Sequence, residues 1–330
     1  MRGTMKAVGL VSGGLDSSIA VALIRSQGIA VVALHCVSPF FGRKEFLPRV
    51  MEKLGAEFRE IFLGEEYLGV VQNPRFGYGK NLNPCIDCKI FMLRKAKAVM
   101  EEEGASFVFT GEVLGQRPKS QMRGTLRLIE RESGLSGLLL RPLSARLLPP
   151  TVPELEGWVR REGLLGIRGR GRKEQIALAE RFGIGEYTSP AGGCLLTDSI
   201  FCERLGDLMR YGPFTIEEVE LLKVGRHFRL APSCKLIVGR DEGENRILLR
   251  EAREGDVLFF PQGGKGPVGL GRGMEDPRFV EISARIIAFY TKNGRDRTTV
   301  FVRNSPQGSY TLEVPKCGEG DLEAFRITGR

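Results

Sequence analysis

The segment MKAVGLVSGGLDSSIA, residues 5–20, runs from an apolar stretch directly into two glycines, an aspartate and two serines. Residues 5–11 predict a buried strand, and the segment from about Ser17 to Ser26 predicts an amphipathic helix. The glycines between the strand and the helix leave backbone N–H groups accessible, and the first turn of the helix adds further unpaired donors. The pattern therefore predicts a loop that binds an anion. A glycine turn with a serine cap is the structural alternative. The spacing fits neither the Walker loop nor the G-x-G-x-x-G dinucleotide pattern.

Strand and helix patterns alternate as far as residue 112. The apolar runs 29–37 and 106–112 and the alternating segment 57–64 predict further strands, and 88–104 predicts a long helix that ends at a glycine. This order indicates an α/β fold with a doubly wound parallel sheet. Ligands of such sheets bind beyond the carboxyl ends of the strands, which is where the serine-rich loop falls.

Length and charge narrow the class of protein. The 330 residues allow two domains, and we predict a first domain over 1–205 and a smaller α+β domain over 206–330, where short strands and turns dominate. The net charge of +9 favours polyanionic partners, although an ordinary basic surface would carry the same charge. The sequence has no run of about 18 apolar residues and no signal-peptide pattern, so we expect a cytoplasmic protein.

The SGGLDSS motif at 12–18, placed after a first strand, resembles the signature of the PP-loop ATP pyrophosphatases. Members of that superfamily split ATP between its α and β phosphates, adenylate a carbonyl-type oxygen and let a nucleophile displace AMP. The resemblance implies ATP and Mg²⁺ as cofactors and Asp16 as a catalytic residue. It also implies nucleotide contacts by Ser12, Gly13, Gly14, Asp16, Ser17 and Ser18. His35, at the end of the second strand, lies where relatives contact the adenine, and a hydrogen-bonded structural histidine is the alternative.

Three of the seven cysteines indicate sulfur or metal chemistry. Cys85 and Cys88 form a C-x-x-C pair just before a predicted helix, whose N-terminus is expected to lower the thiol pKa and favour thiolates. Such a pair suits a redox site, half of a zinc site or an iron–sulfur cluster. Cys194 follows two glycines in a later loop. The other four, Cys36, Cys202, Cys234 and Cys317, are interpreted as buried or incidental.

Together, the loop and these cysteines resemble the tRNA thiouridine synthases of the PP-loop superfamily. TGEVLGQRPKSQ (110–121), LLRPLSARLL (139–148) and RKEQIALAERFGI (172–184) are similar to elements of the 4-thiouridine and archaeal-type 2-thiouridine synthases. In cluster-dependent relatives three cysteines hold a 4Fe–4S cluster with one iron open for sulfide, and the matching residues here are Cys85, Cys88 and Cys194. The nucleotide and base pocket would include Gly111, Glu112, Gln116 and Gln121. Zinc, or a persulfide route without metal, are the alternatives at the cysteine site.

Two further features indicate RNA binding. Flexible basic residues between glycines suit contacts with a tRNA backbone, with a solvated loop as the alternative; they are Arg160, Arg161, Arg168, Arg170, Arg172 and Lys173. The C-terminal segment CKLIVGRDEGENRILL, residues 234–249, resembles the RNA-binding module of ribosome quality-control factors.

The resulting hypothesis is an ATP-dependent tRNA sulfurtransferase that adenylates a uridine carbonyl oxygen and replaces it with sulfur. Its expected partners are tRNA and a sulfur donor, either sulfide or a cysteine desulfurase, with no membrane and with a homodimer left open. A PP-loop enzyme that acts on a small-molecule acceptor, by sulfuration or amidation, is the second hypothesis. An RNA-binding adaptor that senses ATP is the third. The uridine position, and the choice between C2 and C4, stay open.

Overall fold

The computed structural model describes residues 5–188, 193–292, 294, 296–304 and 308–327. The chain divides into two compact units, Met1–Thr197 and Asp198–Arg330. Helix α8 (Ser199–Tyr211) belongs to the second unit and runs across position 205, where the sequence placed the domain boundary. Within the described part of the chain, no helix is long and apolar enough to cross a membrane.

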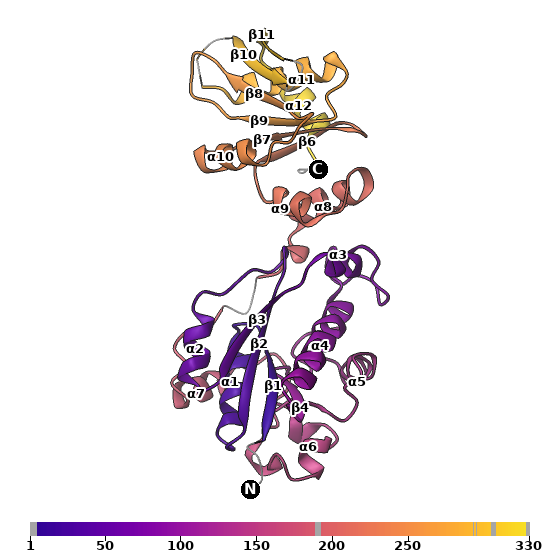
Figure 1. Ribbon diagram of the computed structural model, residues 1–330, viewed down its shortest axis with the longest axis vertical. Coiled ribbons are helices and arrows are strands. Elements are labelled where there is room, and N and C mark those ends of the chain that lie inside the picture. Colours follow the sequence, from indigo (N-terminus) through magenta and orange to yellow (C-terminus); the bar gives the residue numbers. More distant parts are fainter. Residues whose placement is uncertain (1–4, 189–192, 293, 295, 305–307, 328–330) are drawn as a thin grey trace. The chain divides into compact units, whose positions relative to one another are not determined.

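The first unit contains the predicted parallel sheet, with five strands in the order β3-β2-β1-β4-β5 (Figure 1). The strands are β1 (Lys6–Val11), β2 (Ala30–Val37), β3 (Glu57–Phe62), β4 (Phe107–Thr110) and β5 (Leu139–Leu140). The helices are α1 (Leu15–Arg25), α2 (Leu47–Lys53), α3 (Glu65–Gln72), α4 (Cys85–Glu102), α5 (Arg123–Glu132), α6 (Val152–Leu155) and α7 (Lys173–Arg181).

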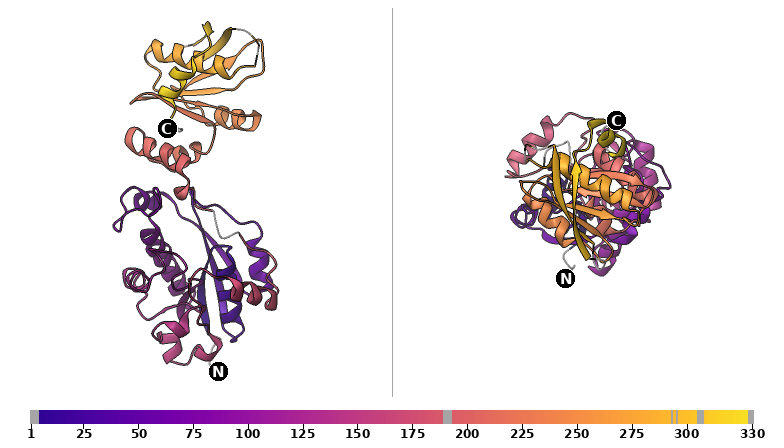
Figure 2. Two further views of the ribbon diagram at one scale, coloured as in Figure 1. Left: turned by 180° about the vertical axis from the view of Figure 1, so that it is seen from behind. Right: turned by 90° about the horizontal axis from the view of Figure 1, so that it is seen from above.

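Helices cover both faces of this sheet (Figures 1 and 2). Helix α1 packs on β1 and β2 from one side and is itself contacted by α2 and α7, whereas α4 packs on β1 and β4 and is contacted by α3 and α5. Side chains of β1 alternate between the two layers: Ala7 and Val11 belong to the core beneath α1. A parallel sheet buried on both faces explains why β1 and β2 are almost wholly apolar.

Two helices begin earlier than the sequence predicted, and both shifts concern the site. Helix α1 starts at Leu15 rather than Ser17, because Gly14 is extended and serves as its N-cap. Helix α4 starts at Cys85, so Cys85 and Cys88 lie in its first turn rather than before it. Each motif is therefore attached to the N-terminal end of a helix.

The second unit is the predicted α+β domain, with six antiparallel strands in the order β11-β10-β8-β9-β7-β6. The strands are β6 (Arg226–Ala231), β7 (Cys234–Val238), β8 (Val257–Pro261), β9 (Gly269–Arg272), β10 (Arg297–Asn304) and β11 (Gly308–Pro315). Besides α8, the helices are α9 (Ile216–Leu221), α10 (Glu242–Arg250), α11 (Pro277–Tyr290) and α12 (Glu319–Phe325).

The prediction that strands and turns dominate this unit was wrong at α10, whereas α11 is one of the few long helices expected there. Helix α10 covers GENRILL, where the sequence predicted short strands. Its N-cap Asp241 accepts a hydrogen bond from the Glu244 amide. Helix α11 begins with Pro277 at its first position, after the N-cap Asp276. The two Asp caps and Pro277 are helix-start signals that outweigh the β-branched content of the segments.

Candidate functional site

The loop between β1 and α1 presents backbone donors at the carboxyl end of the central strand. Gly13 has a φ of 76°, a conformation that side chains disfavour, and Gly14 then leads into α1. The Ser17 hydroxyl donates to the Gly14 carbonyl at 2.8 Å and so fixes the first turn of the helix. From the far end of the unit, the Thr188 amide donates to the Gly13 carbonyl at 2.9 Å. The loop is thus held from both sides, and the N-terminal amides of α1 are left for a ligand.

A second glycine allows the β4 loop to lie directly against this helix start. A Cβ atom on Gly111 would lie 2.5 Å from the backbone of Asp16 and Ser17, closer than such atoms approach one another. Two side chains orient Asp16. The Gln116 amide donates to Asp16 Oδ2 at 3.0 Å. The Arg172 guanidinium lies 3.9 Å from the same oxygen. Asp16 Oδ1 is buried and has no hydrogen-bond partner among the described residues.

His35 lies at the end of β2 beside this loop and is 4% exposed. Its Nδ1 is 3.0 Å from the Val11 carbonyl oxygen, which assigns the ring proton to Nδ1 because a carbonyl can only accept. Nε2 is then an acceptor, and it is buried without a partner among the described residues. His35 therefore offers one hydrogen-bond acceptor to a ligand.

The three cysteines singled out in the sequence lie together at the start of α4. Asn83 connects two of them: the Cys85 thiol donates to Asn83 Oδ1 at 2.9 Å, and Asn83 Nδ2 is 3.6 Å from Cys194 Sγ. The buried Tyr67 hydroxyl donates to Cys88 Sγ at 3.0 Å. Burial raises the pKa of Tyr67 well above its ordinary value, and negative charge on the three cysteines acts in the same direction, so Tyr67 stays a donor.

The prediction that the helix N-terminus lowers the pKa of these thiols was wrong. Burial raises the pKa of Cys88 to about 11, although the Tyr67 hydrogen bond and the charge of Lys89 oppose it. Burial also raises the pKa of Cys85, against the charges of Arg117 and Lys89. Desolvation of the thiolate exceeds the effect of nearby positive charge, so both groups are neutral thiols at neutral pH.

One cavity of about 300 Å³ in the first unit joins the glycine loop to the cysteines. Of the predicted nucleotide residues it is lined by Ser12, Gly14, Asp16, Ser17, His35, Gly111 and Gln116. Cys85, Cys88 and Cys194 line it as well, as do Glu112 and Gln121. Gly13 and Ser18 form the loop and the helix behind this lining. The cavity also carries four cations, which suit an anionic ligand: Lys44, Lys89, Arg117 and Arg172.

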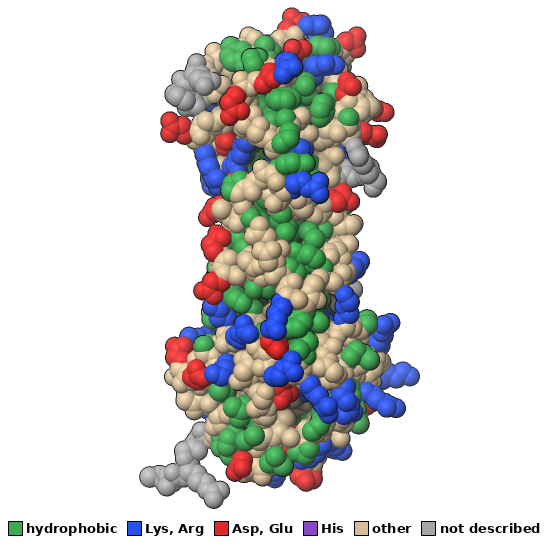
Figure 3. Space-filling model, turned by 90° about the vertical axis from the view of Figure 1, so that its right-hand side faces the viewer, with side chains coloured by type: hydrophobic (Ala, Val, Ile, Leu, Met, Phe, Trp, Pro, Cys, Tyr) green, Lys and Arg blue, Asp and Glu red, His purple; other side chains and the backbone are tan. Residues whose placement is uncertain are grey.

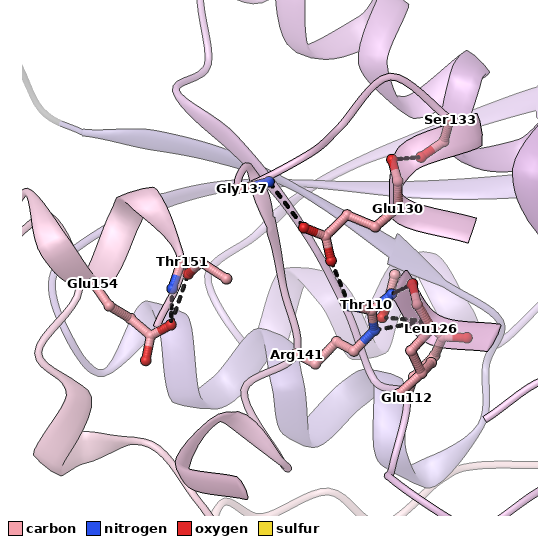
Figure 4. A network of polar contacts seen from close by, with 9 residues as sticks. All are labelled: Thr110, Glu112, Leu126, Glu130, Ser133, Gly137, Arg141, Thr151 and Glu154. Atoms are coloured by element: carbon pink, nitrogen blue, oxygen red, sulfur yellow. Dashed lines mark hydrogen bonds and ion pairs between the residues drawn. The ribbon is translucent and has the colours of Figure 1, made fainter. Parts of the chain in front are cut away.

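A buried ion-pair network supports the cavity wall (Figure 4). Glu112 is 2% exposed and lies 3.2 Å from Arg141 and 3.1 Å from Lys89. Arg141 also binds Glu130 and donates to the Leu126 carbonyl. Burial alone would raise the pKa of the Glu112 carboxyl, but the charges of Lys89 and Arg141 outweigh it and hold that pKa below its ordinary value.

The basic residues predicted to contact RNA are placed in different surroundings. Arg172 lies in the cavity near Asp16, whereas Arg168, Arg170 and Lys173 are exposed. Arg161 is engaged by Glu154 and by the Leu148 carbonyl. The exposed Arg160 lies beside Gln27, which its backbone contacts. The six residues therefore differ in their exposure and in their contacts.

Sequence reasoning missed several residues of the site. Asn83, Tyr67, Lys44 and Thr188 contact the loop, the cavity or the thiols but stand outside the motifs. Asn83 had a local signal, because it lies two residues before Cys85 in the segment NPCIDC. Tyr67 had none, since only the packing of α3 on α4 brings it to Cys88.

Thiols are the donors that zinc and iron–sulfur clusters prefer. Among the described residues, no three His, Cys, Asp or Glu side chains come close enough together to bind one metal ion. Three thiols line one end of the cavity, and they are the kind of donor that either an iron–sulfur cluster or zinc would take.

Comparisons with known proteins agree with the two units. Residues 3–146 match the family model described as thiamine biosynthesis protein (ThiI), and residues 225–326 match the NFACT protein RNA binding domain. A probable tRNA sulfurtransferase of Methanothermobacter thermautotrophicus is 36% identical over 34% of this chain and 30% of its own length. A counterpart in Thermococcus kodakarensis is 27% identical over 42% of this chain and 36% of its own length.

Two further similarities extend over about half of the chain. The tRNA-specific 2-thiouridylase MnmA of Syntrophomonas wolfei is 28% identical over 53% of this chain and 52% of its own length. The crystal structure of a 4-thiouridine synthetase–RNA complex with bound ATP matches with a TM-score of 0.40, at 23% identity over 54% of this chain and 41% of that one. The chain spans about a third of the length of the sulfurtransferases it matches. The resemblances drawn from the sequence are therefore confirmed for these two parts of the chain: residues 3–146 are similar to ThiI, and residues 225–326 are similar to the NFACT RNA-binding domain.

Proposed function

We propose that this protein is an ATP-dependent tRNA sulfurtransferase that adenylates a uridine carbonyl oxygen and replaces it with sulfur. The observation that carries the proposal is the single cavity lined both by the glycine loop and by Cys85, Cys88 and Cys194. ATP activation alone needs the first group of residues, and sulfur transfer needs the second. The names of the matched relatives support the same reaction class.

The loop end of the cavity is suited to ATP. The phosphates would bind the N-terminal amides of α1, with Arg172 and Lys44 offsetting their charge. The adenine would donate its 6-amino group to His35 Nε2, the buried acceptor without a partner. Mg²⁺, when bound, would neutralise phosphate charge, and the buried Asp16 Oδ1 is the oxygen donor that such an ion prefers.

Activation would follow from this placement. The uridine oxygen attacks the α phosphorus and pyrophosphate leaves, giving an adenylated base. The amides of α1 stabilise the extra negative charge on phosphorus because they are fixed before the reaction. The Gln116 contact holds Asp16 in one orientation beside these amides.

The cysteine end would supply the sulfur. A 4Fe–4S cluster held by Cys85, Cys88 and Cys194 would offer an open iron for sulfide. Asn83 holds Cys85 and Cys194 near each other, and Tyr67 donates to Cys88, so the three side chains are oriented before anything binds. Since the thiols are neutral in the protein as described, loading must release protons. Sulfide-level sulfur held here would form a bond to the activated carbon, and AMP would leave as the carbon–oxygen bond breaks.

Pyrophosphate release tests the activation step and separates the hypotheses. We expect release from ATP to require tRNA, and Asp16→Asn to abolish it. Release that requires a small acceptor instead would support small-molecule sulfuration or amidation. Release under no condition would leave an RNA-binding adaptor.

Metal analysis tests the sulfur site. The protein is purified without oxygen, and its iron, acid-labile sulfide and zinc are measured together with its visible spectrum. We expect about four irons and four sulfides per chain, lost in the Ala variants of Cys85, Cys88 and Cys194. Cys202→Ala is the matched control, because Cys202 is a buried cysteine of α8. A persulfide on Cys194 without metal, or stoichiometric zinc, would contradict the cluster and leave the activation step intact.

A further inference from the structure

Helix α5 carries a stripe of arginines that the motifs of the sequence do not include. Its sequence is RGTLRLIERE, and Leu126 and Ile129 are its buried side chains. Arg123, Arg127 and Arg131 are each four residues apart and all are exposed. Residues at this spacing share one face of a helix and rise by about 6 Å per step. The three arginines therefore lie in a row along the exposed face of α5.

The neighbouring helix α4 widens this row into a basic surface. Arg94, Lys97 and Arg131 line one shallow groove between α4 and α5, together with Glu101 and Glu132. Figure 3 shows Lys and Arg side chains gathered on this side of the first unit. We call the set Arg94, Lys97, Arg123, Arg127 and Arg131 the α5 basic surface.

Acidic neighbours neutralise only part of this surface. Glu101 pairs with Lys97, and Glu132 is shared between Arg131 and Arg75. Among the described residues, no carboxylate forms an ion pair with Arg127 or with Arg123, whose guanidinium donates to the Leu147 carbonyl. A surplus of cations with exposed guanidinium groups favours a polyanion.

The α5 basic surface is continuous in sequence with the cavity. The segment that precedes α5 lines the cavity through Gln116, Arg117 and Gln121, and Arg123 follows two residues later. Lys119, between them, binds the Tyr78 carbonyl in the segment that leads to Cys85. Cations thus follow one another from the cavity wall along the exposed face of α5.

We propose that the α5 basic surface binds the phosphate backbone of the tRNA whose uridine enters the cavity. This inference rests on the proposed function, since it takes tRNA as the substrate. Backbone contacts of this kind fix the position of an RNA without reading its sequence. The four-residue repeat suits successive phosphates of one strand, and the arginines can bind each phosphate through two N–H groups.

The test measures binding of the full chain to fluorescein-labelled tRNA transcripts by anisotropy, over a series of KCl concentrations. The variants are Arg127→Gln, Arg131→Gln and the double variant Arg123→Gln/Arg127→Gln, because Gln retains helix propensity. Each lost phosphate contact should reduce the slope of log K against log salt by about 1 and weaken binding equally for different tRNA sequences. Arg181→Gln is the matched control, since Arg181 is exposed on α7, which packs with α1 on the other face of the sheet.

The outcomes separate this inference from the proposed function. A wild-type slope and affinity in the double variant would overturn the inference and leave tRNA thiolation standing. A reduced slope without any thiolation by the wild-type chain would support the surface and contradict the reaction. Absence of tRNA binding by the wild-type chain would overturn both. Thermal unfolding of each variant, expected to match the wild type, verifies that the fold is retained.

Discussion

Replacing Arg141 with methionine should destabilise the first unit more than any surface change nearby. Arg141 is 4% exposed and binds Glu112 at 3.2 Å, Glu130 at 3.1 Å and the Leu126 carbonyl at 3.0 Å. Methionine fills much of the same space but leaves Glu112, which is 2% exposed, with Lys89 as its remaining cation. Breaking a buried pair from one side costs about 3–5 kcal/mol, because the other charge stays buried. That is a large part of the roughly 5–15 kcal/mol that stabilises a domain.

Trp158 makes this measurement specific to the first unit. It is the one tryptophan of the chain, and it packs against the core beneath α1. Urea unfolding of the full chain, followed by tryptophan fluorescence, therefore reports the stability of this unit. The matched control is Arg146→Met, since Arg146 is an exposed arginine of the same segment and should change stability by less than about 0.5 kcal/mol. Adding Glu112→Gln to Arg141→Met should restore part of the loss, because it removes the buried carboxylate that has lost one of its two cations.

The pH dependence of stability is an independent test of the Glu112–Arg141 ion pair. The pKa of Glu112 is lowered in the folded protein, so its contribution is present above the ordinary carboxyl pKa and is lost as the pH falls through the lowered value. The difference in stability between the wild type and Glu112→Gln should therefore shrink on acidification below about pH 4. The reasoning is refuted if Arg141→Met loses no more stability than Arg146→Met, or if Glu112→Gln does not rescue it.

Three further predictions concern the cavity. The pKa of Cys88 is about 11, so the rate of its alkylation by iodoacetamide in the metal-free chain should rise about tenfold per pH unit from pH 7 to 9.5. Mass spectrometry would follow the reaction. A plateau of the rate near pH 8 would contradict the conclusion that burial raises this pKa. Gly111→Ala places a Cβ 2.5 Å from the α1 backbone, so it should lower the free energy of unfolding, measured with urea, by about 1–3 kcal/mol and abolish pyrophosphate release. Gly124→Ala, where a Cβ meets open space, should change neither the stability nor the release. Asn83→Ala removes the hydrogen bonds to Cys85 and Cys194, so the iron and sulfide content should fall at least severalfold. ATP binding, measured by calorimetry, should be retained. An unchanged iron content would show that Asn83 does not position the thiols.

The sequence predicted the first unit well because its signals are local. Apolar runs, the glycine loop and the alternation of elements define a parallel sheet and the edge where its ligand binds. The motif residues Asp16, Gln116 and Cys85 do line one cavity, although they come from three separate segments. Resemblance to a family supplied that grouping, since spacing along the chain does not contain it.

What the sequence could not supply depends on burial and packing. Cys85 and Cys88 lie in the first turn of α4, where a helix N-terminus lowers thiol pKa in an exposed setting, yet burial reverses the direction of the shift. Tyr67 reaches Cys88 from another helix. Arg172 belongs to a basic segment but turns into the cavity toward Asp16, which separates it from the exposed Arg168 and Arg170. Composition treats these arginines alike, whereas the tertiary structure gives them different surroundings.

The ion pair between Lys89 and Glu112 gives the cavity a property that neither of its ends has alone. Lys89 follows Cys88 on α4, and Glu112 follows Gly111, which contacts the helix start that carries Asp16. A shift of the cysteine helix would therefore disturb Glu112, which the buried Arg141 holds from its other side. A reaction that activates a base with ATP and then attacks the same carbon with sulfur needs both groups at fixed positions relative to one base. The buried network of Lys89, Glu112 and Arg141 connects the cysteine end of the cavity to the glycine-loop end and so meets this need. We therefore expect that loss of the network impairs sulfur transfer more than it impairs the binding of ATP or tRNA.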